Sequence, residues 1–281
     1  IVIEHRLDIV LPFVDKVFHV GNRKVNEITD REKYLKEQST EIEDTCSTFI
    51  GTLPAFSLSD VAFSVKDRDI LNGVTFDILK GSRAVLLGEN GCGKTTLLRL
   101  ISRLEKPTRG VILQNIDDKF GQKSKQSKKW YKKVGVVYQN PDYQLFMQTV
   151  EKEIKFGAKS DEYADEIAEK FGIKHLYARH PQSLSEGQKR RVSIAAVVAT
   201  DPEVLILDEP TVGQDYKGLC EMVEVLNRIH EETHNTMITV THDKRCAAAL
   251  CDRSVWIKDG KTYKTGDKRL IDEFFIQIGK N

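Results

Sequence analysis

Residues 88–95, Gly-Glu-Asn-Gly-Cys-Gly-Lys-Thr, have the composition and spacing of a loop that binds the phosphates of a nucleotide. Glycines let the backbone bend so that successive N–H groups converge on the phosphate oxygens. In such a loop Lys94 reaches the β- and γ-phosphates, and the Thr95 hydroxyl binds Mg²⁺. The nucleotide-binding residues predicted from this motif are Gly88, Glu89, Asn90, Gly91, Cys92, Gly93, Lys94, Thr95 and Thr96.

The sequence around the loop fits the same interpretation. Residues 83–87 form a short apolar run that is typical of a buried strand, and residues 96–104 place leucine and isoleucine at helical spacing. A strand, a glycine loop and a helix in this order point the positive end of the helix at the phosphates. The alternative, a glycine-rich turn that merely joins a strand to a helix, is disfavoured by the complete motif in its required context.

Further along the chain, polar residues follow three other apolar runs. Asp208 and Glu209 end a second apolar run, Gln139 follows a third, and His242 follows a fourth. Ser185 precedes a helix that it can cap, and the exposed N–H groups of that helix offer an anion site. Taken singly, an Asp-Glu pair after a strand is usually only a strand end, and a lone histidine is usually structural. The order in which they occur along the chain argues against those interpretations.

Composition limits the class of protein. The chain has 281 residues, 40% of them hydrophobic and 30% charged, which is ordinary for a soluble globular protein. The net charge of +1 provides no overall basic field, so no nucleic-acid partner is expected. No apolar run approaches the roughly 20 residues that span a bilayer, so any membrane role depends on a partner. Five cysteines without zinc-ligand spacing favour a reducing cytosol.

From residue 55 the pattern is that of one complete α/β domain, residues 55–281. Antiparallel strands are expected at its start, and strands that alternate with helices then predict a mainly parallel core sheet. The polar, helical stretch at about residues 140–182 is inserted between core strands and should form a separate helical lobe. Residues 117–133, with seven lysines, could bind nucleic acid, but such a run is more often a solvated loop.

The beginning of the chain repeats a pattern found near its end. Laid over each other without gaps, His5 falls on His242, Asp15 on Asp252 and Lys24 on Lys261. Residues 1–47 are therefore expected to be the C-terminal remnant of a preceding copy of the domain, and residues 48–54 the linker. Chance similarity of two strand–helix–strand units is the alternative. The first residue, Ile1, is not methionine, so we expect a fragment of a longer chain.

Together, the motifs at residues 88–95, Gln139, residues 184–188, Asp208-Glu209 and His242 resemble those of the ATP-binding-cassette (ABC) ATPases, over residues 55 to about 266. The resemblance implies a P-loop NTPase fold that binds ATP and Mg²⁺ and hydrolyses ATP. Residues 134–146 and 184–196 look like the ATPases of energy-coupling-factor transporters, which drive uptake of vitamins and of cobalt or nickel.

In that family two cassettes work together with a transmembrane coupling protein and a substrate-binding membrane subunit, at the cytoplasmic face of the membrane. Residues 5–15 also resemble the end of a first cassette in members that fuse both ATPases into one chain. The resemblance therefore implies that the second cassette is an upstream domain of the full-length chain or a homologue. A soluble ABC ATPase that acts on ribosomes or nucleic acid is the main alternative, and a non-hydrolysing regulatory cassette is another.

The resemblance also assigns roles to residues. Glu209 is implied to be the general base, His242 to contact the γ-phosphate, and Gln139 to contact Mg²⁺ and the attacking water. Asp208 and Thr95 would hold Mg²⁺, and Lys94 would act in catalysis. The signature loop of the family caps the ATP of the partner cassette, and a nearby loop crosses the interface. The residues that match these two loops are Ser185, Glu186, Gly187 and Gln188 in the signature, and Asp215 in the interface loop.

Three positions depart from the family pattern. Glu186 stands where glycine is usual, and Gln214 stands where leucine is usual. The adenine-stacking aromatic of the family falls near Val65, and an aliphatic side chain loses the stacking interaction. Phe63 is the expected substitute.

Overall fold

The structure is a computed structural model that describes residues 14–21, 24–38, 42, 51–66, 68–116 and 130–279. The strand expected around His5, the linker residues 48–50 and the basic residues 117–129 lie outside the described residues.

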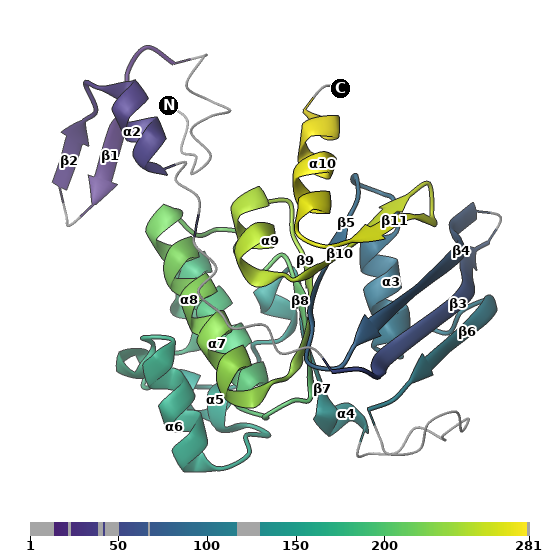
Figure 1. Ribbon diagram of the computed structural model, residues 1–281. Helices are drawn as coiled ribbons and strands as arrows, with labels where there is room; N and C mark the ends of the chain where they lie inside the picture. The colour runs from purple at the N-terminus through teal and green to yellow at the C-terminus, as the bar shows by residue number, and fades with distance from the viewer. Residues whose placement is uncertain are drawn as a thin grey trace.

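A six-stranded sheet forms the centre of the main domain, with the strand order β11-β10-β5-β9-β8-β7 (Figure 1). Its strands are β5 (Arg83–Leu87), β7 (Val134–Val137), β8 (Val204–Asp208), β9 (Thr236–Val240), β10 (Arg253–Lys258) and β11 (Lys261–Gly266). All neighbours pair in parallel except β11, which pairs antiparallel with β10 at the edge. Every residue of β5, β8 and β9 is buried, as a parallel sheet with both faces covered requires. The predicted mainly parallel core is confirmed.

A second, antiparallel sheet has the strand order β4-β3-β6 and consists of β3 (Pro54–Val65), β4 (Arg68–Leu79) and β6 (Arg109–Gln114). Helix α3 (Lys94–Ile101) packs between this sheet and the core sheet. One hydrophobic cluster joins Phe56 of β3, Leu86 of β5 and Leu97 of α3. This shared core fixes the loop between β5 and α3 against the edge of the antiparallel sheet.

The remaining helices form two groups. The helical lobe contains α5 (Val150–Lys155), α6 (Asp161–Lys170) and α7 (Glu186–Val198), with the short 3₁₀ turns η2 (Pro141–Tyr143), η3 (Lys174–Leu176) and η4 (Pro181–Ser183). Helix α7 packs against both α5 and α6. Helices α8 (Tyr216–Thr233), α9 (Lys244–Leu250) and α10 (Arg269–Ile278) pack together beside the core sheet.

The end of the basic stretch differs from the solvated loop that the sequence favours. Residues Trp130–Lys133 form the short helix α4, and Trp130 is only 2% exposed. The Arg103 guanidinium lies 4.7 Å from the centre of the Trp130 ring. Burial of the large apolar ring, with a cation over its face, accounts for the packing of this segment against the domain.

The first described elements are β1 (Phe18–Gly21), β2 (Lys24–Glu27) and α2 (Arg31–Gln38). In the alignment that sets His5 on His242, the hairpin β1–β2 falls on β10–β11, and α2 falls on α10. The antiparallel pair Gly21–Lys24 coincides with the pair Lys258–Lys261. The repeat in the sequence is thus matched by the same order of elements.

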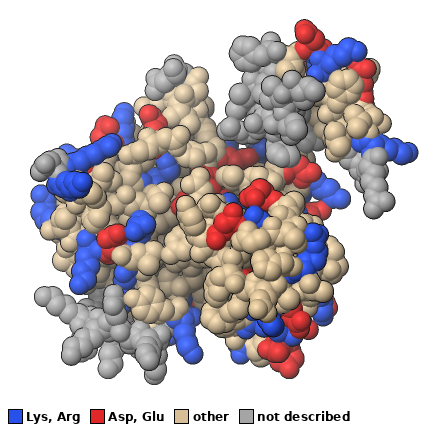
Figure 2. Space-filling view, turned by 180° about the vertical axis from the view of Figure 1, so that it is seen from behind, with Lys and Arg blue, Asp and Glu red and all other residues tan. Residues whose placement is uncertain are grey.

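Figure 2 shows Lys and Arg side chains interspersed with Asp and Glu side chains over the face drawn there, in keeping with the net charge of +1. Within the described part of the chain, no helix has the length and apolar character needed to cross a membrane.

Candidate functional site

A cavity of about 340 Å³ lies over the loop between β5 and α3. It brings together residues that are far apart in the sequence, from the loop, from the ends of β7, β8 and β9, and from β4. The lining residues are Arg68, Ile70, Asn90, Gly91, Gly93, Lys94, Thr95, Thr96, Gln139, Asp208, Glu209, Val240 and His242.

The loop itself is shaped by glycines at positions where a side chain would not fit. Gly93 has φ +103°, and a Cβ atom there would lie 2.5 Å from Cδ2 of Leu71. The Lys94 ammonium group folds back over the loop and donates to the carbonyl oxygens of Gly88 at 2.6 Å and Glu89 at 3.0 Å. No side chain caps the start of α3, so its first N–H groups are available to an anion.

Two buried carboxylates stand at the end of β8. Asp208 is 6% exposed and Glu209 is 5% exposed. Glu209 has φ +52°, a strained conformation for a residue with a side chain, and such strain clusters at functional sites. Its Oε2 accepts a hydrogen bond from the backbone N–H of His242 at 3.2 Å, and its Oε1 lies 3.5 Å from the His242 Nε2.

Burial dominates the acid–base properties of this pair. It raises the pKa of Asp208 from its usual value, although Arg190 and Lys94 act in the opposite direction. Burial likewise raises the pKa of Glu209 to about 7, assisted by the neighbouring Asp208. A carboxyl group with a pKa near neutrality is suited to take up a proton at physiological pH. The pair can therefore provide one proton acceptor and one cation ligand.

Gln139 is held at the cavity by residues that sequence reasoning missed. The buried Arg190 of α7 donates through Nη1 to the Tyr138 carbonyl at 2.8 Å and through Nη2 to the Gln139 carbonyl. The Gln144 side chain accepts from the N–H of Tyr138 at 3.0 Å and donates to the Val136 carbonyl at 2.6 Å. The only sequence signal for Arg190 was its place in the helix that follows the signature loop.

The signature residues do not line the cavity. Ser185 caps α7, as predicted, and forms a reciprocal capping box with Gln188. Glu186 is largely exposed, and its carboxylate lies 3.4 Å from the Lys189 ammonium group. The Gln214 side chain donates to the Gly187 carbonyl at 3.0 Å, so the unusual glutamine ties the interface loop to the signature loop.

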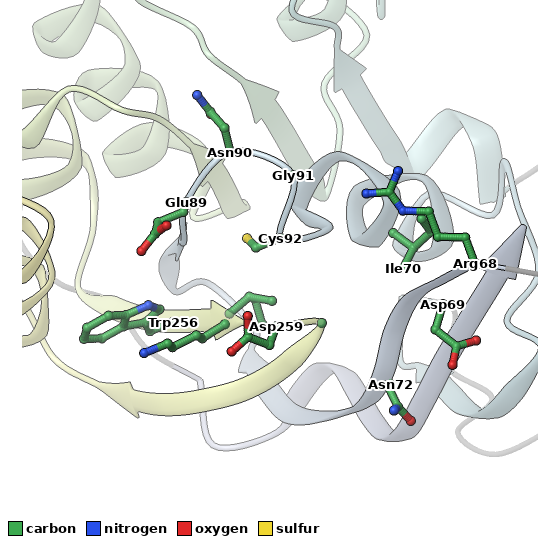
Figure 3. A pocket seen from close by; sticks show the side chains of 13 residues that line it. Arg68, Asp69, Ile70, Asn72, Glu89, Asn90, Gly91, Cys92, Trp256 and Asp259 are labelled. Atoms are coloured by element: carbon green, nitrogen blue, oxygen red, sulfur yellow. The ribbon is translucent and has the colours of Figure 1, made fainter. Parts of the chain in front are cut away.

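Asp215 also lies away from the cavity, where its carboxylate caps α8 by accepting from the N–H of Gly218 at 2.7 Å. Glu89 and Cys92 line a neighbouring cavity of about 430 Å³ (Figure 3), which shares Arg68, Ile70, Asn90 and Gly91 with the first.

The two residues expected at the nucleotide base, Val65 and Phe63, do not line either cavity. Val65 is 49% exposed and lines neither cavity. Phe63, the expected substitute, packs against the hydrophobic core instead. These side chains lie elsewhere because Val65 ends β3 beside the turn to β4, whereas Phe63 belongs to the part of the strand that covers the core.

The residues present fit a nucleoside triphosphate with Mg²⁺. Lys94 and the uncapped start of α3 supply positive groups, and Thr95, Gln139 and Asp208 supply oxygen atoms in the same cavity. Within the described ranges, no group of three His, Cys, Asp or Glu side chains could hold a metal ion. That agrees with Mg²⁺ chemistry, because this ion is usually bound by one or two protein groups together with phosphates and water. Among the described residues, the buried Oε1 of Glu209 has no hydrogen-bond partner, as expected of an atom that awaits a ligand.

Comparison with known proteins identifies relatives of the whole domain. The chain matches the profile of the ABC transporter family over residues 71–212. It is 39% identical over 213 residues to the energy-coupling factor transporter ATP-binding protein EcfA2 of Bacillus subtilis (strain 168), covering 72% of this chain and 77% of that protein.

Two solved structures resemble the fold. The first is CbiO1 from Clostridium perfringens, part of the ABC transporter complex CbiONQ, with a TM-score of 0.69 and 32% identity, over 81% of this chain and 94% of CbiO1. The second is the dimeric ATP-binding cassette MJ0796 in a post-hydrolysis state bound to ADP and Pi, with a TM-score of 0.66 and 26% identity, over 76% of this chain and 99% of that chain.

Proposed function

This chain belongs to the ABC transporter family of ATPases, and we propose that it powers an energy-coupling-factor-type importer of a vitamin or a metal ion. The observation that carries the proposal is the single cavity shared by Lys94, Gln139, Asp208, Glu209 and His242. The similarity to EcfA2 and to CbiO1 supports the transporter class.

In the proposed catalytic cycle, Lys94 leaves the loop carbonyls and binds the β- and γ-phosphates. Thr95, Gln139 and Asp208 would hold Mg²⁺, which when bound would neutralise charge that develops on the phosphates. Glu209 accepts the proton of the attacking water, and the backbone N–H of His242 keeps the Glu209 carboxylate in place. The His242 side chain then contacts the γ-phosphate.

The second half of each site comes, in this proposal, from another cassette. Ser185 and the start of α7 are outside the chain's own cavity, with N–H groups at a helix N-terminus that suit an anion. Ser185, Glu186, Gly187 and Gln188 would cap the ATP held by the partner, with Asp215 beside them at the interface. The dimeric state of MJ0796 supports this arrangement. ATP binding would close the dimer, and hydrolysis would reopen it.

The first part of the chain is proposed to be the end of a preceding cassette, residues 1–47, joined by the linker 48–54 to the complete domain 55–281. The coincidence of β1, β2 and α2 with β10, β11 and α10 supports this division. Phe18, Val20 and Val25 of the first hairpin are all more than half exposed. Their counterparts in β10, Val255 and Ile257, are buried in the core of the complete domain.

The membrane partners are proposed to be a transmembrane coupling protein and a substrate-binding subunit, with the ATPase at the cytoplasmic face. Three exposed aromatic side chains follow Gln139 on the helical lobe: Tyr143, Phe146 and Phe156 are 79%, 67% and 59% exposed. Phe146 and Phe156 pack edge to face with ring centres 5.4 Å apart. Exposed aromatic side chains that follow Gln139 so closely in the chain are suited to receive a coupling protein that must influence the catalytic site.

The test is purification of the full-length tagged chain from its own cells after mild solubilisation of the membranes, with the bound proteins identified by mass spectrometry. The expected result is recovery of polytopic membrane proteins, and the loss of these proteins when Tyr143 and Phe146 are both changed to Glu. Recovery with ribosomes or DNA in place of membrane proteins contradicts the transporter assignment.

A further inference from the structure

The nucleotide cavity has two walls of different chemistry. Gln139, Asp208 and His242 follow strands of the core sheet, whereas Arg68 and Ile70 come from β4 of the antiparallel sheet. The γ-phosphate must lie toward the core sheet, because the carboxylates and the histidine are there. The base, at the other end of the nucleotide, must then point toward the wall formed by β4.

Arg68 is the residue of this wall that can contact a base. Its side chain is exposed, and among the described residues it makes no hydrogen bond or ion pair. The adjacent Asp69 is engaged elsewhere, because the Ser64 hydroxyl donates to its carboxylate at 2.6 Å. Figure 3 shows the Arg68 side chain beside Ile70, with Asp69 pointing the other way, and both Arg68 and Gly91 line the cavity.

The register of the hairpin explains why Arg68 replaces the expected residue. Val65 and Arg68 are direct cross-strand partners at the end of β3 and β4. Directly opposed residues of an antiparallel pair place their side chains on the same face. Arg68, with its longer side chain, reaches the cavity that Val65 does not line.

We propose that Arg68 stacks its guanidinium group on the base of the bound nucleotide, with Ile70 as the apolar support beside it. A guanidinium group is planar and stacks on aromatic rings, and it is more weakly hydrated than an ammonium group. Stacking is tolerant of base identity because every base has a π-face. The proposal rests on the nucleotide site described above and predicts similar affinity for ATP and GTP.

The experiment compares the full chain with the variants Arg68→Ala, Arg68→Lys and Arg68→Tyr, using calorimetry with Mg²⁺ and ATP, GTP or inorganic triphosphate. We expect Arg68→Ala to lose about tenfold in affinity for both nucleotides and nothing for triphosphate. Arg68→Tyr should keep the affinity of the unmodified chain, because tyrosine also stacks on a base, whereas Arg68→Lys should bind as weakly as Arg68→Ala. Arg109→Ala, which removes an exposed arginine of β6 outside both cavities, serves as the matched control and should bind like the unmodified chain.

Three outcomes overturn the proposal. The first is an unchanged nucleotide affinity in Arg68→Ala, and the second is an Arg68→Lys variant that binds as tightly as the unmodified chain. The third is a loss of triphosphate affinity in Arg68→Ala that equals its loss of nucleotide affinity, which would assign Arg68 to the phosphates. The variant Lys94→Ala shows separately whether the phosphate site itself is assigned correctly. If the site is correct, this variant loses triphosphate as well as ATP, whatever Arg68 does.

Discussion

Glu209 combines burial, backbone strain and a pKa raised to about 7. We expect Glu209→Gln to lower the turnover of ATP by about 100-fold or more, because glutamine cannot accept the proton of the attacking water. ATP affinity should persist, since the phosphate loop is unchanged. Phosphate release and calorimetry measure the two quantities separately. Turnover equal to that of the unmodified chain would remove Glu209 from the role of base.

The same residue sets a pH dependence. Desolvation raises the pKa of Glu209 to about 7, so the carboxylate needed as base is lost as the pH falls below that value. We expect kcat/KM for ATP to rise through about pH 7 and to fall about tenfold per pH unit on the acid side. Steady-state rates between about pH 5.5 and 8.5 test this. A flat profile over that interval is incompatible with Glu209 as the titrating group.

At the scale of elements, much of the fold could be predicted from the sequence. Apart from Arg83 and Asp208, the runs 83–87 and 204–208 are apolar, as expected of strands in a parallel sheet that is covered on both faces. The phosphate-binding loop could also be predicted from the sequence, because a backbone that bends around a phosphate needs glycines at this spacing.

The remaining features depend on contacts between distant residues. Nothing local indicates that Arg190 binds the carbonyl of Gln139, or that Arg68 lies opposite Val65. The prediction of a solvated loop at residues 117–133 fails at Trp130 for the same reason. A lysine-rich sequence predicts exposure to solvent, whereas the Trp130 ring is buried. Side-chain partners that are set by tertiary packing have no periodic signal in the sequence.

Arg83, a charged residue in the otherwise apolar strand β5, connects this strand to α8 and to the start of β10. Its buried guanidinium lies 2.5 Å from the Asp252 carboxylate before β10 and donates to the Asn227 side chain of α8 at 3.0 Å. We expect Asp252→Ala to lower the free energy of unfolding by about 3–5 kcal/mol, because it leaves a buried charge without its counter-ion. Glu224→Ala, which breaks an exposed pair with Arg228 on α8, should cost less than about 1 kcal/mol. Equal effects in urea denaturation would contradict the structural role of Arg83.

At the scale of the whole molecule, the phosphate loop and the signature loop of this chain are at separate places. Lys94 and Glu209 line the cavity, whereas Ser185 caps α7 outside it, and Gln214 links the signature loop to the interface loop. Under the proposed function, a site divided in this way is completed when two cassettes face each other head to tail. Dimerisation and ATP binding are then linked, and each must strengthen the other.

That linkage can be tested with the slow variant Glu209→Gln, in which a second copy of the chain stands in for the partner cassette. With Mg²⁺ and ATP we expect this variant to sediment as a dimer, because bound ATP is not consumed and the two signature loops remain engaged. Adding Ser185→Arg should return it to a monomer that still binds ATP, since the larger cation blocks the approach of α7 to the partner's phosphates while the chain's own cavity is untouched. Analytical ultracentrifugation gives the mass and calorimetry gives the ATP affinity. A doubly substituted chain that remains dimeric would show that the interface does not pass through the signature loop.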